Sequence, residues 1–305
     1  MWWAECSGNL RQIPVKAVEK LRFLSIAREL RAFTLWIAQD QSGNKFYCFR
    51  LRPTLSADPE VRESLARSLA PFQGLSHPAL ARFYGTRGVE EFLALYEYCD
   101  GEFLSDVLAL KGKLPLSEAL EIAVKVSEAL AELHRAGMVN GSLSPDEILL
   151  LRGGGLKVLG VGLSQAIYHL GAPYRIWLDP LWIAPEMHQG KPLTPAADVY
   201  SVGLILQRML TGPYPTAERI IPLSPKLEEI LRICLSPNPH SRYRNTHQVQ
   251  MLLTDELKAS EKEQEAVEEE MFDWVALLLG AIALLAVVGV VILWTIVYYR
   301  YAGLL

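Results

Sequence analysis

The sequence predicts an α+β domain followed by one long apolar helix. Apolar residues recur at helical spacing from Ser117 to Leu133 and again from Val199 to Leu210. Two short apolar runs, Ile148 to Leu151 and Leu156 to Val161, lie between these helices and flank a Gly-rich segment, which is typical of a β-hairpin. A last apolar run, from Val275 to Val297, carries no charged residue.

Local signals mark where these elements begin and end. Pro115 and Ser117 supply a start signal for the first helix, and Gly137 stops it. The segment Arg152-Gly153-Gly154-Gly155 supplies the turn of the hairpin. A loop rich in Gly and Pro then leads to the second helix. The order is therefore helix, hairpin, loop and helix.

A set of short motifs in this order resembles the eukaryotic-type (Ser/Thr) protein kinase family over roughly Val18 to Leu253. The resemblance implies a two-lobed protein kinase fold, with a small β-rich lobe and a larger helical lobe. The motifs are Ser76-His77-Pro78-Ala79-Leu80, Glu97-Tyr98-Cys99, Leu133-His134-Arg135-Ala136-Gly137, Ala184-Pro185-Glu186, Asp198-Val199-Tyr200-Ser201-Val202-Gly203 and Cys234-Leu235-Ser236-Pro237-Asn238-Pro239-His240-Ser241-Arg242.

The chain departs from the family at the positions that carry its chemistry. The family places a catalytic Asp and a metal-binding Asn in the catalytic loop, and a second metal-binding Asp in the D-F-G motif. Here those positions are Ser142, Glu147 and Gly160. Serine is no base near neutral pH without an activating partner, and glycine has no ligand atom. The family's third-strand Lys falls on Arg50, whose planar guanidinium has a different geometry.

The loop that covers the phosphates departs as well. The family needs glycines there so that backbone N–H groups can approach the phosphates. The three positions are Arg28, Leu30 and Phe33 in this chain. Asp179 stands where the family usually has a Thr that contacts the substrate loop, and Gly141 replaces an Arg. The degenerate positions are therefore those that, in the family, supply the catalytic base, bind the metal, cover the phosphates and contact the substrate.

We interpret the chain as a catalytically inactive pseudokinase because it lacks these residues. We therefore expect that it is not an enzyme and that it binds no cofactor and no metal. A general base alone supplies roughly 10²- to 10⁴-fold of rate. The expected role is that of a protein-binding scaffold or allosteric regulator, whose partner is another protein such as an active kinase or its substrate. Two alternatives stay open. One is an unorthodox active Ser/Thr protein kinase that recruits Asp146, Glu147 and Asp179, and the other is an ATP-sensing switch without turnover.

Three further residues match structural positions of the family. The resemblance implies that Glu186 pairs with Arg242 and that Asp198 binds the backbone of the catalytic loop. Neither contact needs ATP. We therefore expect these residues to hold the large lobe together.

The C-terminal apolar run predicts a membrane anchor. Its 23 uncharged residues, at about 1.5 Å per residue, span a hydrocarbon core of ~30 Å. Aromatic residues at or near both ends are typical of interfacial anchors. They are Trp274, Trp294, Tyr298, Tyr299 and Tyr301. We expect a single-pass, tail-anchored protein with its kinase-like domain in the cytosol. Small residues at Ala276, Gly280 and Ala283 suggest weak homodimer formation through this helix.

The predicted organisation has six parts. They are an N-terminal extension (1–17), a kinase-like small lobe (18–98), a kinase-like large lobe (99–253), an acidic juxtamembrane linker (254–273), a transmembrane helix (274–298) and a short tail (299–305). A net charge of −4 argues against nucleic acid as a partner. Four cysteines without a C-x-x-C pair fit a reducing cytosol and no zinc site.

Overall fold

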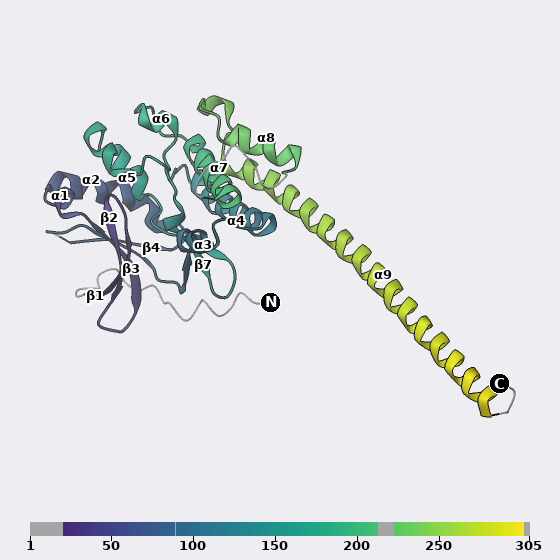
Figure 1. Ribbon diagram of the computed structural model, residues 1–305. Coiled ribbons are helices and arrows are strands. Elements are labelled where there is room, and N and C mark those ends of the chain that lie inside the picture. The colour runs from purple at the N-terminus through teal and green to yellow at the C-terminus, as the bar shows by residue number, and fades with distance from the viewer. Residues whose placement is uncertain (1–20, 89, 213–222, 302–305) are drawn as a thin grey trace. The chain divides into compact units, whose positions relative to one another are not determined.

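The computed structural model describes residues 21–88, 90–212 and 223–301 of the chain (Figure 1). The chain divides into two compact units, Met1–Glu256 and Leu257–Leu305. The expected N-terminal extension, 1–17, and most of the expected tail lie outside the described residues.

The small lobe is built on a five-stranded antiparallel sheet with the strand order β1-β2-β3-β5-β4. Its strands are β1 (Arg22–Glu29), β2 (Phe33–Gln39), β3 (Lys45–Leu51), β4 (Phe83–Arg87) and β5 (Leu93–Glu97). The helical segments between β3 and β4 are α1 (Pro53–Ser56), α2 (Pro59–Leu69) and η2 (Ala70–Gly74). Helix α2 begins where Asp58 accepts a hydrogen bond from the Glu60 N–H and Pro59 takes the first helical position.

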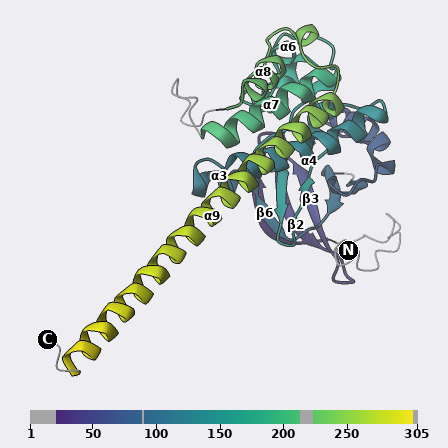
Figure 2. The same ribbon diagram turned by 90° about the vertical axis from the view of Figure 1, so that its right-hand side faces the viewer.

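The large lobe is mainly helical. Helices α4 and α7 pack against each other, and both views show them side by side (Figures 1 and 2). Its helices are α3 (Leu104–Lys111), α4 (Leu116–Arg135), α5 (Leu163–His169), α6 (Pro185–His188), α7 (Pro195–Thr211) and α8 (Pro225–Cys234), with short 3₁₀ turns η3 (Pro145–Glu147), η4 (Ala172–Trp177) and η5 (Pro239–Ser241). A three-stranded sheet in the order β6-β7-β8 joins β6 (Gly101–Phe103), β7 (Ile148–Leu151) and β8 (Leu156–Val158). The expected β-rich small lobe and helical large lobe are confirmed.

The predicted elements match the observed ones closely. The expected hairpin is β7 and β8, and its second strand ends at Val158, before Gly160 adopts a φ of 65°. The second apolar helix begins earlier than expected, at Pro195, because Pro is favoured in the first turn of a helix.

A buried ion pair joins two distant segments of the large lobe. The Arg242 guanidinium donates to both carboxylate oxygens of Glu186 at 2.7 Å each, and both side chains are buried. Arg242 also donates to the carbonyls of Ala196 (2.9 Å) and Ser236 (2.7 Å). Its guanidinium lies 4.7 Å from the centre of the Tyr200 ring. Hydrogen bonds from Arg242 therefore connect α6, α7 and the segment that follows α8.

The last helix, α9, runs from Thr246 to Tyr301 and is continuous through the expected linker and the expected span. Within it Leu277–Tyr301 is long and apolar enough to cross a membrane, with a mean hydropathy of 2.9, and none of its most apolar window is buried. Such a helix in contact with water would expose a large apolar surface.

The ion pair yields a stability prediction. Glu186→Ala should lower the free energy of unfolding by about 3–5 kcal/mol, because the buried Arg242 would lose its partner. The matched control is Glu118→Ala, which removes a half-exposed carboxylate paired with Lys111 and should cost at most about 1 kcal/mol. Urea melts of the three proteins measure both effects. Equal shifts would show that the Glu186 pair does not support the large lobe.

Candidate functional site

Asp198, at the start of α7, fixes the backbone of the segment that resembles a catalytic loop. Its carboxylate is buried and accepts the N–H groups of Asn140 (2.9 Å) and Gly141 (2.7 Å). The Nε2 of His134 lies 2.8 Å from the same carboxylate. That Asp198 holds the large lobe together remains a prediction, but these contacts place residues 140–141 directly on α7.

Asn140 is a positioning residue that the sequence analysis missed. Its side-chain N–H group donates to the Ser142 carbonyl at 2.5 Å, and its side-chain oxygen accepts the Gly162 N–H at 3.0 Å. The Asn140 amide therefore connects the segment 140–147 to the segment around Gly160. Ser142 itself is buried, and its hydroxyl donates to the Trp182 carbonyl at 3.3 Å. Among the residues that the structure describes, no acidic side chain accepts the Ser142 proton.

Glu147 is a buried carboxyl at the end of η3. Its Oε2 accepts the N–H and the hydroxyl of Ser144, each at 2.9 Å, in a capping box. Burial, with a smaller contribution from the nearby carboxylates of Asp146 and Asp179, raises the pKa of the Glu147 carboxyl from 4.5 to about 7. The hydrogen bonds from Ser144 offset this only in part. Glu147 thus titrates near neutral pH.

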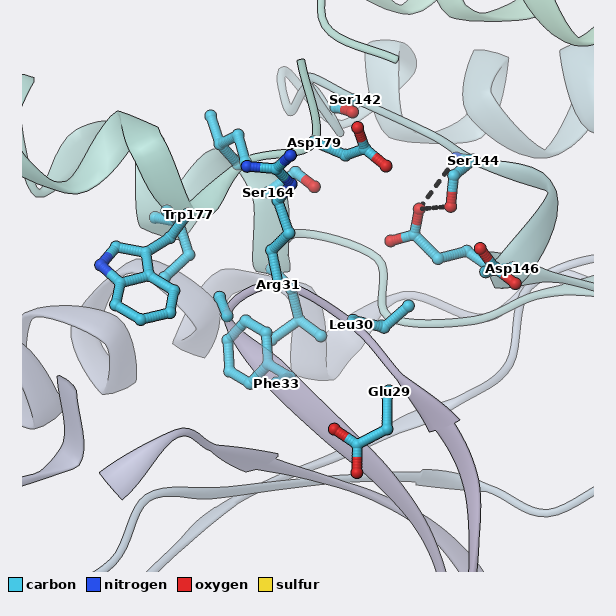
Figure 3. Close-up of a pocket in the computed structure, with 15 residues that line it drawn as sticks. Glu29, Leu30, Arg31, Phe33, Ser142, Ser144, Asp146, Ser164, Trp177 and Asp179 are labelled. Carbon is cyan, nitrogen blue, oxygen red and sulfur yellow. Dashed lines mark hydrogen bonds between the residues drawn. The ribbon is translucent and has the colours of Figure 1, made fainter. Parts of the chain in front are cut away.

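A cavity of about 140 Å³ lies between the β1–β2 turn and this segment (Figure 3). Its lining brings together Ser142, Asp146, Glu147 and Asp179. The sequence analysis missed several other lining side chains, among them Glu29, Arg31, Ser164 and Trp177. Figure 3 shows the Arg31 side chain reaching from the turn toward Ser164 and Asp179. Arg31 could have been found from the sequence, because it lies between Leu30 and Phe33, two of the degenerate phosphate-loop positions.

The degenerate phosphate loop is held by arginines. The Arg28 guanidinium forms an ion pair with Asp106 of α3 and a second with Asp146 at 3.3 Å, and it lies 4.1 Å from the centre of the Phe103 ring. The Arg52 side chain donates to the carbonyls of Leu30 and Arg31 at 2.8 and 2.7 Å. Of the other two expected positions, Leu30 and Phe33, both line the cavity. Side chains thus occupy the turn where the family has glycines.

Arg50 does not point into the cleft, so the sequence alignment of the third-strand Lys needs a correction. Arg50 pairs with Glu91 at 2.5 Å and lies over the Phe23 ring, on the outer face of the sheet. Successive residues of a strand point to opposite faces. The side chain on the cleft side is therefore Phe49, whose ring would lie 3.0 Å from a Cβ at Gly160.

Aromatic rings fill the inner face of the small lobe. Phe49 packs edge-on against Tyr96 at 5.3 Å, and the Tyr96 hydroxyl donates to the Val161 carbonyl at 2.8 Å. Tyr47, also buried, donates its hydroxyl to the Cys99 carbonyl at 3.1 Å, in the segment that resembles the hinge. Phe49 and Tyr47 thus occupy space between the sheet and the segments 97–99 and 160–161.

The residues present do not fit magnesium held as in the family. Gly160 offers no ligand atom, and one oxygen of Glu147 is already bonded to Ser144. Among the described residues, no group of three His, Cys, Asp or Glu side chains is placed to hold a metal ion. The chemistry available to the cavity is that of carboxylates and one guanidinium.

The raised pKa of Glu147 predicts a pH-dependent stability. The unfolded state ionises near pH 4.5 and the folded state near pH 7, so the folded chain should lose about 3 kcal/mol as pH rises through this window. Glu147→Gln should remove this loss and be more stable than the parent at pH 8, with a smaller difference or none at pH 4.5. The matched control, Glu118→Gln, should change little at either pH. Parallel melting curves of Glu147→Gln and parent across this range would contradict the burial of a titrating carboxyl.

The chain matches a model of the protein kinase domain over residues 37–271. Serine/threonine-protein kinase PknA of Mycobacterium tuberculosis is 30% identical over 240 residues, which cover 69% of this chain and 55% of PknA. Serine/threonine-protein kinase PknB of Mycolicibacterium smegmatis is 25% identical over 64% of this chain and 36% of PknB. The chain therefore spans about a third to about half of the length of these relatives.

A solved structure shows the same fold. The kinase domain of Mycobacterium tuberculosis PknI matches 78% of this chain and 97% of its own with a TM-score of 0.63, at 19% identity. The predicted two-lobed protein kinase fold is confirmed.

The prediction that this chain is no enzyme is contradicted by its curated relatives, which are named serine/threonine-protein kinases. That prediction rested on residue types at aligned positions, and at Arg50 the alignment did not give the face on which the side chain lies. The family model covers well over half of the 305 residues, and the chain belongs to the protein kinase family.

Proposed function

We propose that the chain is an unorthodox Ser/Thr protein kinase held at a membrane. In this proposal the Ser or Thr hydroxyl oxygen of the substrate attacks the γ-phosphorus of ATP and ADP leaves, while Glu147 accepts the proton of that hydroxyl and Arg31 binds the phosphoryl group that is transferred. The observation that carries it is the cavity, which is lined by a carboxyl with a pKa of about 7 and by a guanidinium. The names of the relatives support the reaction class.

The pKa of Glu147 suits proton transfer near neutral pH. A general base works best when its pKa lies close to the working pH, because enough of it is ionised and it still holds the proton well. Burial at the end of η3 supplies that pKa, and the two Ser144 bonds fix the carboxyl in one orientation. Arg31 carries a charge that is permanent at any physiological pH.

A second candidate is a protein-binding scaffold or allosteric regulator. The observation that favours it is the packing of Tyr47 and Phe49 against the hinge-like and Gly160 segments. A cavity of about 140 Å³ is also below the ~300–1,000 Å³ of typical small-molecule pockets. In this role the fold itself would be recognised by another protein.

Both candidates include the membrane. The proposal places the lobes, 18–98 and 99–253, on the cytosolic side, joined by the acidic linker 254–273 to a span at 274–298. Trp294 stacks on Tyr298 at 5.7 Å near the end of the span, which suits an aromatic pair at the lipid–water boundary.

Phosphoryl transfer by variants tests the first candidate. Glu147→Gln should lower kcat/KM by roughly 10²- to 10⁴-fold, whereas Arg50→Gln, on the outer face, should leave it unchanged. The parent rate should rise with pH up to about 7 and then level off, because the base must be ionised. Transfer of labelled phosphate to a protein substrate by the full chain in lipid nanodiscs measures all three.

Two results would contradict this mechanism. Loss of activity in Arg50→Gln would mean that Arg50 acts as the family's Lys does. If the folded parent chain transfers no phosphate, the kinase proposal is rejected and the protein-binding role is the one that stands.

The membrane part has its own test. Deleting residues 274–305 should release a folded kinase-like domain from vesicles, since Met1–Glu256 forms a compact unit by itself. A second variant keeps the helix length and replaces Leu285 and Val288 with Lys, at a cost of about 2.5–3.5 kcal/mol of insertion free energy each. Vesicle flotation should find both variants in the soluble fraction. Aggregation of the deleted form, with a parent chain that is soluble without detergent, would show that the segment is part of a core.

A further inference from the structure

A second hollow adjoins the cavity. It has a volume of about 300 Å³ and lies between Arg31 of the β1–β2 turn and the segment 175–188. Its polar side is formed by Arg31, Arg175 and His188, and its apolar side includes Ile176, Leu178 and Met187. Arg31 and Leu178 line the cavity as well. The groove is therefore continuous with the proposed site of transfer.

The groove is positively charged in a chain that is acidic overall. No Asp or Glu of the described residues lines it, although the chain has a net charge of −4. Within the described part of the chain, Arg31 donates only to the Ile176 carbonyl, at 3.4 Å, and Arg175 stacks on Tyr168 at 4.8 Å. The Nε of Arg175 is buried without a hydrogen-bond partner. Among the described residues, no carboxylate forms an ion pair with either guanidinium, although Arg31 also faces the carboxylates of the cavity.

Apolar side chains lie exposed beside these charges. Ile176 is 71% exposed and Leu181 is 76% exposed. Exposed apolar residues next to a groove mark interaction sites more often than single scattered ones do. The pattern of guanidinium groups beside apolar side chains complements an extended peptide with the opposite charge and its own apolar residues.

We propose that this groove binds a segment of the substrate protein in which acidic residues adjoin apolar ones, on one side of the Ser or Thr. The acidic residues would pair with Arg175, since Arg31 is assigned to the transferred group, and the apolar ones would cover Ile176 and Leu178. This substrate class rests on the proposed kinase activity, whereas the binding it describes needs no phosphoryl transfer. A basic segment would place like charges together, which disfavours the wrong partner.

Fluorescence anisotropy with the full chain in lipid nanodiscs tests the groove without ATP. The probe is a labelled peptide with two glutamates beside a leucine and an isoleucine, and with alanine in place of the phosphate acceptor. Matched peptides replace both glutamates with lysine or both apolar residues with serine. We expect the acidic, apolar probe to bind at least tenfold more tightly than either.

Charge reversal in the chain supplies the second arm. Arg175→Glu should weaken the acidic probe at least tenfold and strengthen the lysine probe, whereas Arg135→Glu, exposed at the end of α4 and not lining the groove, should change neither. Ile176→Ser, at an exposed position, should weaken the acidic probe without loss of stability. Arg175→Glu that leaves the preference intact, or equal binding of acidic and lysine probes, overturns the proposal.

The two proposals fail separately. If the chain binds the probes in a charge-dependent way but transfers no phosphate to a serine-containing probe, the groove proposal stands and the kinase proposal is rejected. Transfer to basic and acidic peptides alike keeps the activity and rejects the groove. Probe affinity that falls as the concentration of the chain rises, together with self-association of the chain, would show that another copy of this chain occupies the groove and would also reject a substrate groove.

Discussion

The buried carboxylate of Asp198 is the constraint on which the site depends. It accepts two backbone N–H groups at the start of the segment 140–147 and one bond from His134. Hydrogen bonds to a charged group contribute about 1.5–3 kcal/mol each, so this segment has little freedom. The path of the segment 140–147 in turn positions the Ser144–Glu147 capping box and the hydrogen bond between the Asn140 side chain and the Gly162 N–H. The segment thereby brings Ser142, Asp146 and Glu147 to one cavity.

The inner face of β3 explains why the cleft differs from the family's. Because the strand places Tyr47 and Phe49 inward and Arg50 outward, two aromatic side chains of β3 lie against the hinge-like segment and Gly160. Their burial stabilises the small lobe, since a buried aromatic side chain contributes on the order of 1.5–3 kcal/mol. The same packing restricts the cleft. Activity at the cavity would therefore depend on Arg31 and on carboxylates of the large lobe.

Most of the fold could be predicted from the sequence because its signals are local. The helices at α4 and α7, the β7–β8 hairpin and the apolar part of α9 follow from periodicity and from Gly and Pro at their ends. The Glu186–Arg242 pair could be anticipated because both residues lie in matched motifs, and the resemblance also implied that Asp198 binds the backbone of the catalytic-loop segment.

The face of Arg50 and the chemistry of the cavity could not be predicted. Four consecutive residues of β3, 46–49, are buried, so alternation of polar and apolar residues does not reveal which face is inward. The pKa of Glu147 depends on burial by residues far away in sequence, and Arg31 reaches the cavity only because the lobes meet there. Residue types at aligned positions therefore led to the wrong prediction that the chain is no enzyme.

The most direct test of the central claim is calorimetric titration of ATP into the full chain, once with magnesium and once with a chelator. If Arg31 binds the phosphoryl group that the family's metal ions bind, ATP should bind with similar affinity in both solutions, and Arg31→Gln should weaken both equally. Binding that requires magnesium would contradict this account, because residues other than Gly160 and the Ser144-bonded Glu147 would then supply a metal site.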